Sequence, residues 1–252
     1  DDKRTNDILR IIGLDHSAQS TICMITCDKF NYLDHDFYEK GIYRVKGEVA
    51  CGLLEIPNGL VWYDREGIGA LYQPGNDNDE ISQLIIAKIK DKLLQRAEYL
   101  PINIGISDPQ VGVKGLKKAY QQAVNAALAA RIKTDDPVKI LQHKDAGIYT
   151  LLADVYSKQS AEEFIKENLG RIIEYDRKKK GNLLYTLEEI VSNASVADIS
   201  KKMFLHPKSV IFRRKRIEKL LNINLNDFDT RLVLAMAIKL HKLNIEDRKS
   251  VV

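Results

Sequence analysis

The chain has 252 residues, of which 44% are apolar and 29% charged, and its formal net charge is +4. This composition is typical of a folded globular protein and excludes extended disorder and a fibrous fold. No run of about 18 apolar residues occurs and Asp1 opens a stretch without the apolar core of a signal peptide, so we expect a cytoplasmic protein with no membrane partner.

The cysteines and the first residue add two expectations. Cys23, Cys27 and Cys51 are an odd number of thiols in a chain long enough to build its own core, which fits a reducing compartment. No second Cys/His pair accompanies Cys23 and Cys27, so we expect buried, inert thiols and no metal site. Because the chain begins with Asp rather than Met, we also expect it to be a portion of a longer protein.

Strands and helices alternate over the first part of the chain. Asn78, Asp79 and Glu80 predict the start of a helix that runs through Leu93, and regularly spaced alanines predict a second helix over 116–130 that lies close on a sheet. The segments 59–63 and 68–72 resemble the two arms of an antiparallel hairpin. The predicted strands are 20–28, 49–56, 59–64, 67–73, 101–107 and 138–142.

From residue 148 onward the pattern is almost entirely helical. We therefore predict an α+β protein with a boundary near residues 147–150, which separates an α/β domain over 1–147 from a helical domain over 148–252. The predicted helices are Leu151 to Tyr156, Ala161 to Tyr175, Leu183 to Val191, Val196 to Met203, Pro207 to Leu221, and about Asp229 to Leu243.

Basic residues are concentrated in the last quarter of the chain. Residues 195–252 hold thirteen Lys or Arg against six Asp or Glu, a net charge of +7, whereas residues 1–194 have a net charge of −3. Between Lys201 and Lys219 there are eight basic residues and one acid, Glu218. This density suits a phosphate backbone, although a solvated helix face is the alternative.

The basic segment has the local signals of a helix-turn-helix over about 195–221. Ser195 and Asp198 form a capping-box pattern at the start of a short helix. A break at Phe204, Leu205 and His206 is followed by Pro207, which is favoured at the first position of a new helix. A short helix, a tight break and a longer basic helix indicate a motif whose second helix enters the major groove of DNA.

Helical spacing assigns two faces to the Pro207–Leu221 helix. Val210, Arg214, Ile217 and Leu221 share the face expected to point inward. The opposing side is expected to face DNA, with the first residues reading base edges and the later cations contacting phosphates, while the preceding helix contacts the backbone. For Arg213 and Arg214, ion pairs with Glu218 or Asp227 remain an equal alternative. The residues expected to contact DNA are Lys208, Ser209, Phe212, Lys215 and Arg216, with Lys201 and Lys202 on the preceding helix.

Three stretches carry a resemblance to a known family: Leu183 to Leu187, Ser195 to Ser200, and Leu205 to Glu218. Together they resemble the carboxy-terminal helix-turn-helix of the PucR/CdaR regulators, in which His206, Arg213, Ile217 and Glu218 match the usual pattern. Ser209, Val210 and Phe212 replace Thr, Leu and Tyr. The resemblance implies DNA binding, and we include His206 and Arg213 among the candidate contact residues.

The chain departs from the family pattern at two places. Pro207 and Lys208 stand where the family has Arg-Asn, and Arg214 stands where it has Leu. If the replaced polar pair touches DNA in the family, the operator read by this chain differs or binding is weaker.

The first domain resembles the GGDEF-like middle domain of the same regulators, through 10–15 and 103–107 and the alanine-rich helix. This implies a degenerate, ferredoxin-like palm related to nucleotide cyclases. Cyclase chemistry needs carboxylates that hold two Mg²⁺, but the hairpin reads Asp64-Arg-Glu-Gly67, and Thr26 and Asp28 replace an aspartate pair. We therefore expect no catalytic activity and no cofactor.

The resemblance implies a regulator of a catabolic operon, of the sugar diacid or purine utilisation type. Its expected partners are double-stranded DNA, a second copy in a homodimer, and a small-molecule effector bound by a missing amino-terminal domain. Two alternatives stay open: a catalytically inactive, cyclase-like interaction or dimerisation module that does not bind DNA, and an active cyclase.

Overall fold

A computed structural model describes residues 10–11, 13–27, 47, 59–63, 67–73, 87, 102–133, 138–153, 155, 158–179, 181–192 and 194–251. The chain forms two compact units. The sheet unit comprises Asp1–Asp154 with Ile245–Val252, and the helical unit comprises Val155–Asn244. The division lies a few residues beyond the boundary expected near 147–150.

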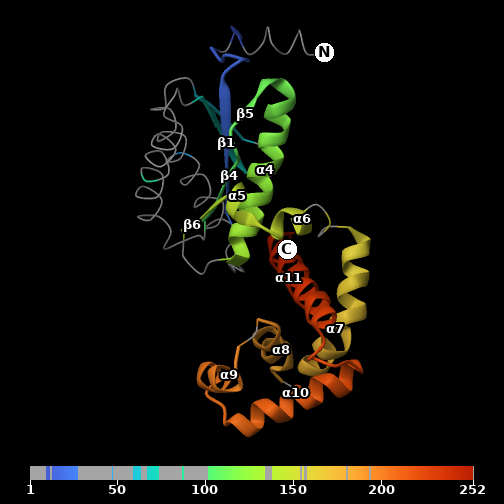
Figure 1. Cartoon of the computed structure of the whole chain (residues 1–252). Helices are drawn as coiled ribbons and strands as arrows, with labels where there is room; N and C mark the ends of the chain where they lie inside the picture. The colour runs from blue at the N-terminus through green and yellow to red at the C-terminus, as the bar shows by residue number, and fades with distance from the viewer. Residues whose placement is uncertain are drawn as a thin grey trace. The chain divides into compact units, whose positions relative to one another are not determined.

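The sheet unit is built on a mixed sheet in which β1 is central (Figure 1). The strand order is β2-β3-β1-β4-β6, and β5 pairs with β1 beside this path. All pairs are antiparallel except β4 with β6, which are parallel. The strands are β1 (Gln19–Cys27), β2 (Gly59–Tyr63), β3 (Ile68–Tyr72), β4 (Ile102–Ile106), β5 (Gln110–Val111) and β6 (Val138–Gln142).

Pairing in the sheet confirms the predicted hairpin. Tyr63 lies opposite Ile68, and Gly59 lies opposite Tyr72, so β2 and β3 form an antiparallel pair. Both faces of the sheet are apolar, because Ile22 and Met24 pack with the helix over Gly112–Lys133 while Cys23 and Ile25 belong to the cluster on the other face. Cys23 is buried, as expected, and burial raises the pKa of its thiol to about 12.

Helix α4 (Gly112–Lys133) lies closely on β1 and β4, as its alanine spacing predicted. Ala119, Ala123 and Ala127 have no exposed surface. The close approach depends on Gly105 of β4, since a Cβ at this position would lie 2.0 Å from the Ala123 carbonyl oxygen. Two short helices, α5 (His143–Ala146) and α6 (Tyr149–Ala153), follow β6 and complete the described part of the unit.

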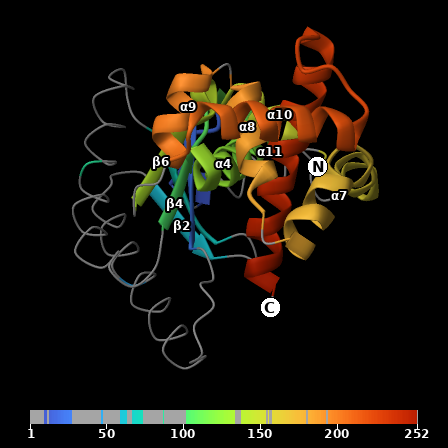
Figure 2. The same cartoon turned by 90° about the horizontal axis from the view of Figure 1, so that it is seen from below.

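The helical unit contains the remaining helices, and three of them begin and end where the sequence predicted. These are α8 (Leu183–Val191), α9 (Val196–Met203) and α10 (Pro207–Leu221), which contact one another around a small apolar core. Figure 2 shows them side by side. The core side chains include Leu187, Ile199, Val210 and Ile217. The two longer helices are α7 (Gln159–Lys179) and α11 (Phe228–Val251).

Helix α7 continues four residues past its predicted end at Tyr175, through the charged segment that starts at Asp176. Its last turn carries basic residues, which favour a helix carboxyl end. The Asp176 carboxylate accepts hydrogen bonds from the backbone amides of Leu183 and Leu184, each 2.9 Å long, and so satisfies the first turn of α8. Gly181 makes room for this carboxylate, because a Cβ there would lie 2.6 Å from Asp176 Oδ1.

The α+β class is thus confirmed, while the ferredoxin-like palm stays a prediction. The predicted strand 49–56, the helix through Leu93, the hairpin loop at Asp64 and Glu66, and Asp28 lie outside the described residues. Within the described part, no three His, Cys, Asp or Glu side chains gather as a metal site. No helix of that part is long and apolar enough to cross a bilayer.

Candidate nucleic-acid interface

Helix α9 starts at the predicted capping box. Ser195 Oγ accepts a hydrogen bond of 3.1 Å from the Asp198 amide, while the Ser195 amide donates one of 3.3 Å to the Asp198 carboxylate. The Ser195 hydroxyl also donates to this carboxylate over 2.6 Å. These bonds stabilise the charged carboxylate and hold the pKa of Asp198 below its usual range.

The turn between α9 and α10 is set by three consecutive residues. Phe204 adopts a left-handed conformation at φ 53° and ψ 43°, which ends α9, and 96% of its surface is exposed. Leu205 then donates its amide to the Ser200 carbonyl over 2.9 Å. His206 is the N-cap of α10, since its Nδ1 accepts from the Lys208 amide at 3.2 Å, and Pro207 occupies the first helical position.

The inward side of α10 is anchored by two side chains. Val210 is 1% exposed and Ile217 is fully buried. Arg214 and Leu221 of the same predicted face are half-buried. Arg214 lies 3.7 Å from Glu218 and donates to Asn226 Oδ1 over 2.7 Å, so the alternative of an ion pair with Glu218 is realised for this arginine.

The opposite side of α10 carries an exposed row that we call the cationic face. It consists of Lys208, Phe212, Lys215, Arg216 and Lys219, all of which are exposed. Their spacing of three to four residues places them along one side of the helix. Lys201, Lys202 and His206 are exposed as well, whereas Ser209 and Arg213 are half-buried.

Three of the candidate cations are engaged by their own chain. Lys202 lies 2.6 Å from the buried Glu189 carboxylate, and this bond raises the pKa of Lys202. Arg213 donates from Nη1 to Thr186 Oγ1 over 3.2 Å. The guanidinium of Arg216 stands over the Tyr175 ring at 5.3 Å, a cation–π distance, and the residue remains exposed.

Three other cations carry no such restraint. Among the described residues, no acid lies within ion-pair distance of Lys201, Lys208 or Lys215.

Two features of the surface were not predicted as contacts. Lys219 extends the cationic face by one turn beyond Lys215, which the four-residue spacing could have indicated, and Phe204 stands out from the turn.

The two departures from the resembled pattern fit this geometry. Pro207 lacks an amide donor at a position where the donor would have no helical partner, so it favours the start of α10. Arg214 points away from the cationic face and toward Asn226. Neither replacement disturbs the row that starts at Lys208.

The motif built by α8, α9 and α10 can be compared with known families. Residues 183–240 match the PucR C-terminal helix-turn-helix domain. These helices form a PucR helix-turn-helix. The PucR domain thus begins at α8 and extends into the first half of α11.

Two curated relatives are similar over longer parts of the chain. The proline-responsive transcriptional activator PutR of Bacillus subtilis is 28% identical over 143 residues, which cover 56% of this chain and 35% of PutR. The DNA-binding transcriptional activator AdeR of the same organism is 21% identical over 189 residues, which cover 74% of this chain and 44% of AdeR. The chain therefore spans less than half the length of either relative.

A solved structure also aligns with the chain. The regulator of polyketide synthase expression from Bifidobacterium adolescentis aligns over 96% of this chain and 92% of its own, with 14% identity and a TM-score of 0.39.

Proposed function

We propose that the chain is part of a DNA-binding transcription regulator and that the cationic face of α10 is its DNA contact surface. The observation that carries the proposal is this exposed row of cations on the second helix of a PucR helix-turn-helix. The names of PutR and AdeR, both transcriptional activators, support the same role.

We propose different tasks for the different contact residues. Lys208 stands in the first turn of α10, the part of a recognition helix that reaches base edges in the major groove. Lys215, Arg216 and Lys201 are placed to neutralise phosphates, which supplies affinity without sequence information. Phe212, 71% exposed in the middle of the row, offers an apolar surface to a thymine methyl group.

Lys202, His206, Ser209 and Arg213 belong to the proposed contact set in a supporting position. Lys202 and Arg213 hold α9 and α10 against α8 through Glu189 and Thr186, and His206 caps α10. Their substitution is expected to weaken DNA binding partly by displacing the recognition helix.

Binding to duplex DNA from the promoter region of its own gene tests the proposal. We expect the double substitution Lys208→Ala with Lys215→Ala to weaken binding at least about tenfold, and to reduce the slope of log affinity against log salt by about one for each lost phosphate contact. The matched control is Lys117→Ala with Lys118→Ala, which removes two exposed lysines from α4 of the sheet unit. Equal retardation by both double variants would contradict the proposed contact face.

We further propose a homodimer in the cytoplasm, in which two recognition helices read a two-fold operator. Light scattering at micromolar concentration should give twice the monomer mass. The regulated genes are proposed to form a catabolic operon of the sugar diacid or purine type; proline utilisation is a further candidate, because PutR is named as proline-responsive. The effector is proposed to bind in an amino-terminal sensor domain.

For the sheet unit we propose a non-catalytic scaffold that dimerises or relays a signal, in the arrangement of a degenerate GGDEF-like palm. Incubation with GTP or ATP and Mg²⁺ is expected to give no cyclic product. Formation of such a product would assign a cyclase activity instead.

A further inference from the structure

A pocket of about 360 Å³ opens inside the helix-turn-helix, on the side of α10 opposite the cationic face. Its apolar wall includes Ile190 of α8, Val196 and Ile199 of α9, and Val210 of α10. Ile199 and Val210 are each 1% exposed, so this wall is part of the packed core of the motif. The volume is at the small end of the range for small-molecule sites.

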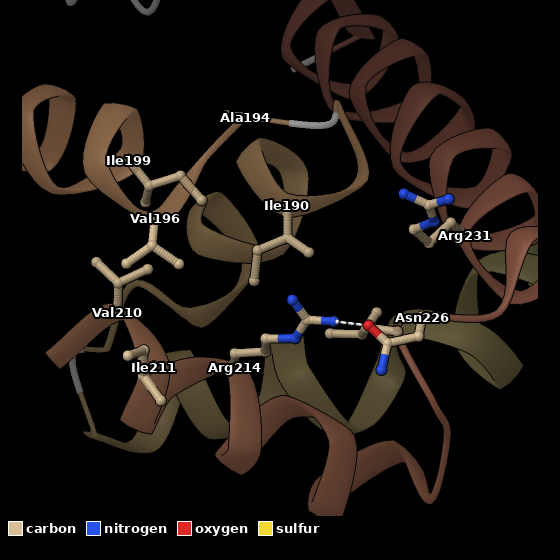
Figure 3. A pocket seen from close by; sticks show the side chains of 10 residues that line it. Ile190, Ala194, Val196, Ile199, Val210, Ile211, Arg214, Asn226 and Arg231 are labelled. Atoms are coloured by element: carbon tan, nitrogen blue, oxygen red, sulfur yellow. Dashed lines mark hydrogen bonds between the residues drawn. The ribbon is translucent and has the colours of Figure 1, made fainter. Parts of the chain in front are cut away.

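The polar part of the pocket is cationic. Arg214 and Arg231 are the charged residues among those that line it, and no Asp or Glu lines it. Figure 3 shows Arg214 extending below Ile190 toward Asn226, with Arg231 on the far side from Val196. The cavity thus combines an apolar wall with guanidinium groups from two different helices.

The two nearby carboxylates have other partners that fix their positions. Glu218 accepts a hydrogen bond of 3.1 Å from the Leu225 amide, and Asp227 accepts one of 2.7 Å from the Thr230 amide at the start of α11. Glu218 also forms an ion pair with Arg214, with 3.7 Å between Nε and Oε1, and Arg214 Nη2 donates to Asn226. A guanidinium has five donors, so Arg214 keeps donors for an anion beside those that face Asn226 and Glu218.

We propose that this pocket binds a small carboxylic acid with an aliphatic or aromatic tail. The carboxylate lies against Arg214 and is drawn by the charge of Arg231, while the tail packs on Ile190, Val196 and Ile211. An arginine is suited to this task because its planar fork matches the two oxygens of a carboxylate. An uncharged compound of the same shape lacks this interaction.

Occupancy of the pocket also has a consequence for DNA binding, which rests on the proposed function. The walls come from α8, α9, α10 and the connection to α11, so the ligand touches both helices of the helix-turn-helix from behind. A ligand shifts an equilibrium when it binds one arrangement better than another. Because the bound acid packs on both helices, we expect it to favour one packing of α9 on α10 and so to change the affinity for DNA.

Calorimetric titration of the full chain, without DNA, tests the site itself. The probes are benzoate and hexanoate, each paired with its neutral amide, benzamide and hexanamide. We expect saturable binding of at least one acid and at least about tenfold weaker binding of its amide. Arg214→Met should weaken binding of that acid at least about tenfold, and Ala194→Leu, which narrows the pocket, should abolish it.

The matched control is Arg177→Met, which removes an exposed arginine from the last turn of α7, away from the pocket. It should leave the affinity for the acid unchanged. Circular dichroism of all variants separates loss of the site from loss of the fold, and Ala194→Leu keeps the test valid if Arg214→Met does not fold. No saturable binding of either acid, equal binding of acid and amide, or equal loss in Arg177→Met would overturn the proposal.

A second measurement, retardation of promoter DNA with and without the bound acid, tests the coupling. We expect the acid to change DNA affinity at least about threefold in the wild type and not in Ala194→Leu. Unchanged DNA affinity with the acid bound would overturn the coupling between the pocket and DNA binding, but not the proposal that the pocket binds the acid. Absence of DNA binding at every acid concentration would instead refute the proposed function.

Discussion

The helices α4 and α10 use their surfaces in opposite ways. Helix α4 lays a row of alanines against the sheet, so closely that Gly105 beneath it has no room for a side chain. Helix α10 buries Val210 and Ile217 and leaves Lys208, Lys215 and Arg216 exposed. Small, apolar residues let α4 pack closely along the sheet, whereas α10 is anchored by a few buried side chains and leaves its opposite side exposed.

The largest effect is expected where α4 meets the sheet. Gly105→Val places a Cβ 2.0 Å from the Ala123 carbonyl oxygen, which α4 can avoid only by moving away. We expect a loss of more than about 4 kcal/mol in the free energy of unfolding, measured with urea, or failure to fold.

The matched control for Gly105 is Gly170→Ala in α7, where the nearest contact of the new Cβ is Lys166 Cγ at 3.7 Å. Because alanine is more favourable than glycine in the interior of a helix, this change should raise the free energy of unfolding by about 0.5–1 kcal/mol. Similar losses in the free energy of unfolding for Gly105→Val and Gly170→Ala would show that α4 does not depend on close packing.

The next largest effect on stability distinguishes the buried side of α10 from its exposed side. Ile217→Ala removes a fully buried side chain and is expected to cost about 2–5 kcal/mol in urea unfolding. Phe212→Ala removes a larger side chain from the cationic face, yet it is expected to change stability by less than about 0.5 kcal/mol. If Phe212→Ala is as destabilising as Ile217→Ala, then the cationic face is packed and is no free surface.

A smaller effect is expected at the start of α9. Ser195→Ala removes the hydroxyl that accepts from the Asp198 amide, and a lost N-cap costs about 0.5–2 kcal/mol. Ser160→Ala, at an exposed position in the first turn of α7, is the control and should change the free energy of unfolding by less than about 0.5 kcal/mol. Equal changes would assign no capping role to Ser195.

The smallest effect concerns pH. Because the folded pKa of Asp198 lies below its ordinary value of 3.8, its charged form stabilises the fold above that value, and this stabilisation is lost as the pH falls through the folded pKa. The melting temperature of the wild type should exceed that of Asp198→Asn at pH 6, and the difference should shrink below about pH 4. A difference that grows toward low pH would contradict the assigned direction.

Local signals explain why the helix-turn-helix could be predicted closely from the sequence. Ser195 with Asp198, and His206 with Pro207, determine where α9 and α10 begin through contacts within three residues, so no knowledge of the fold is needed. The inward positions of Val210 and Ile217 follow from helical spacing in the same way. The strands β1 to β4 were likewise predicted from short apolar runs.

Contacts between distant residues could not be predicted. Lys202 meets Glu189, and Arg216 stands over Tyr175, because helices separated in sequence are packed together. The sheet order depends on pairings such as Cys23 with Ala70, which leave no local pattern. The short elements α5 and β5 carry too few residues for a periodic signal, and the pocket behind α10 exists only where four chain segments converge.

The hydrogen bonds from Leu183 and Leu184 to Asp176 have a mechanical consequence. One carboxylate in the last turn of α7 accepts from two amides in the first turn of α8, so it ties the end of one helix to the start of the next. Because these amides lose their partner in Asp176→Ala, we expect that variant to loosen the junction between α7 and α8 without changing any side chain of the cationic face.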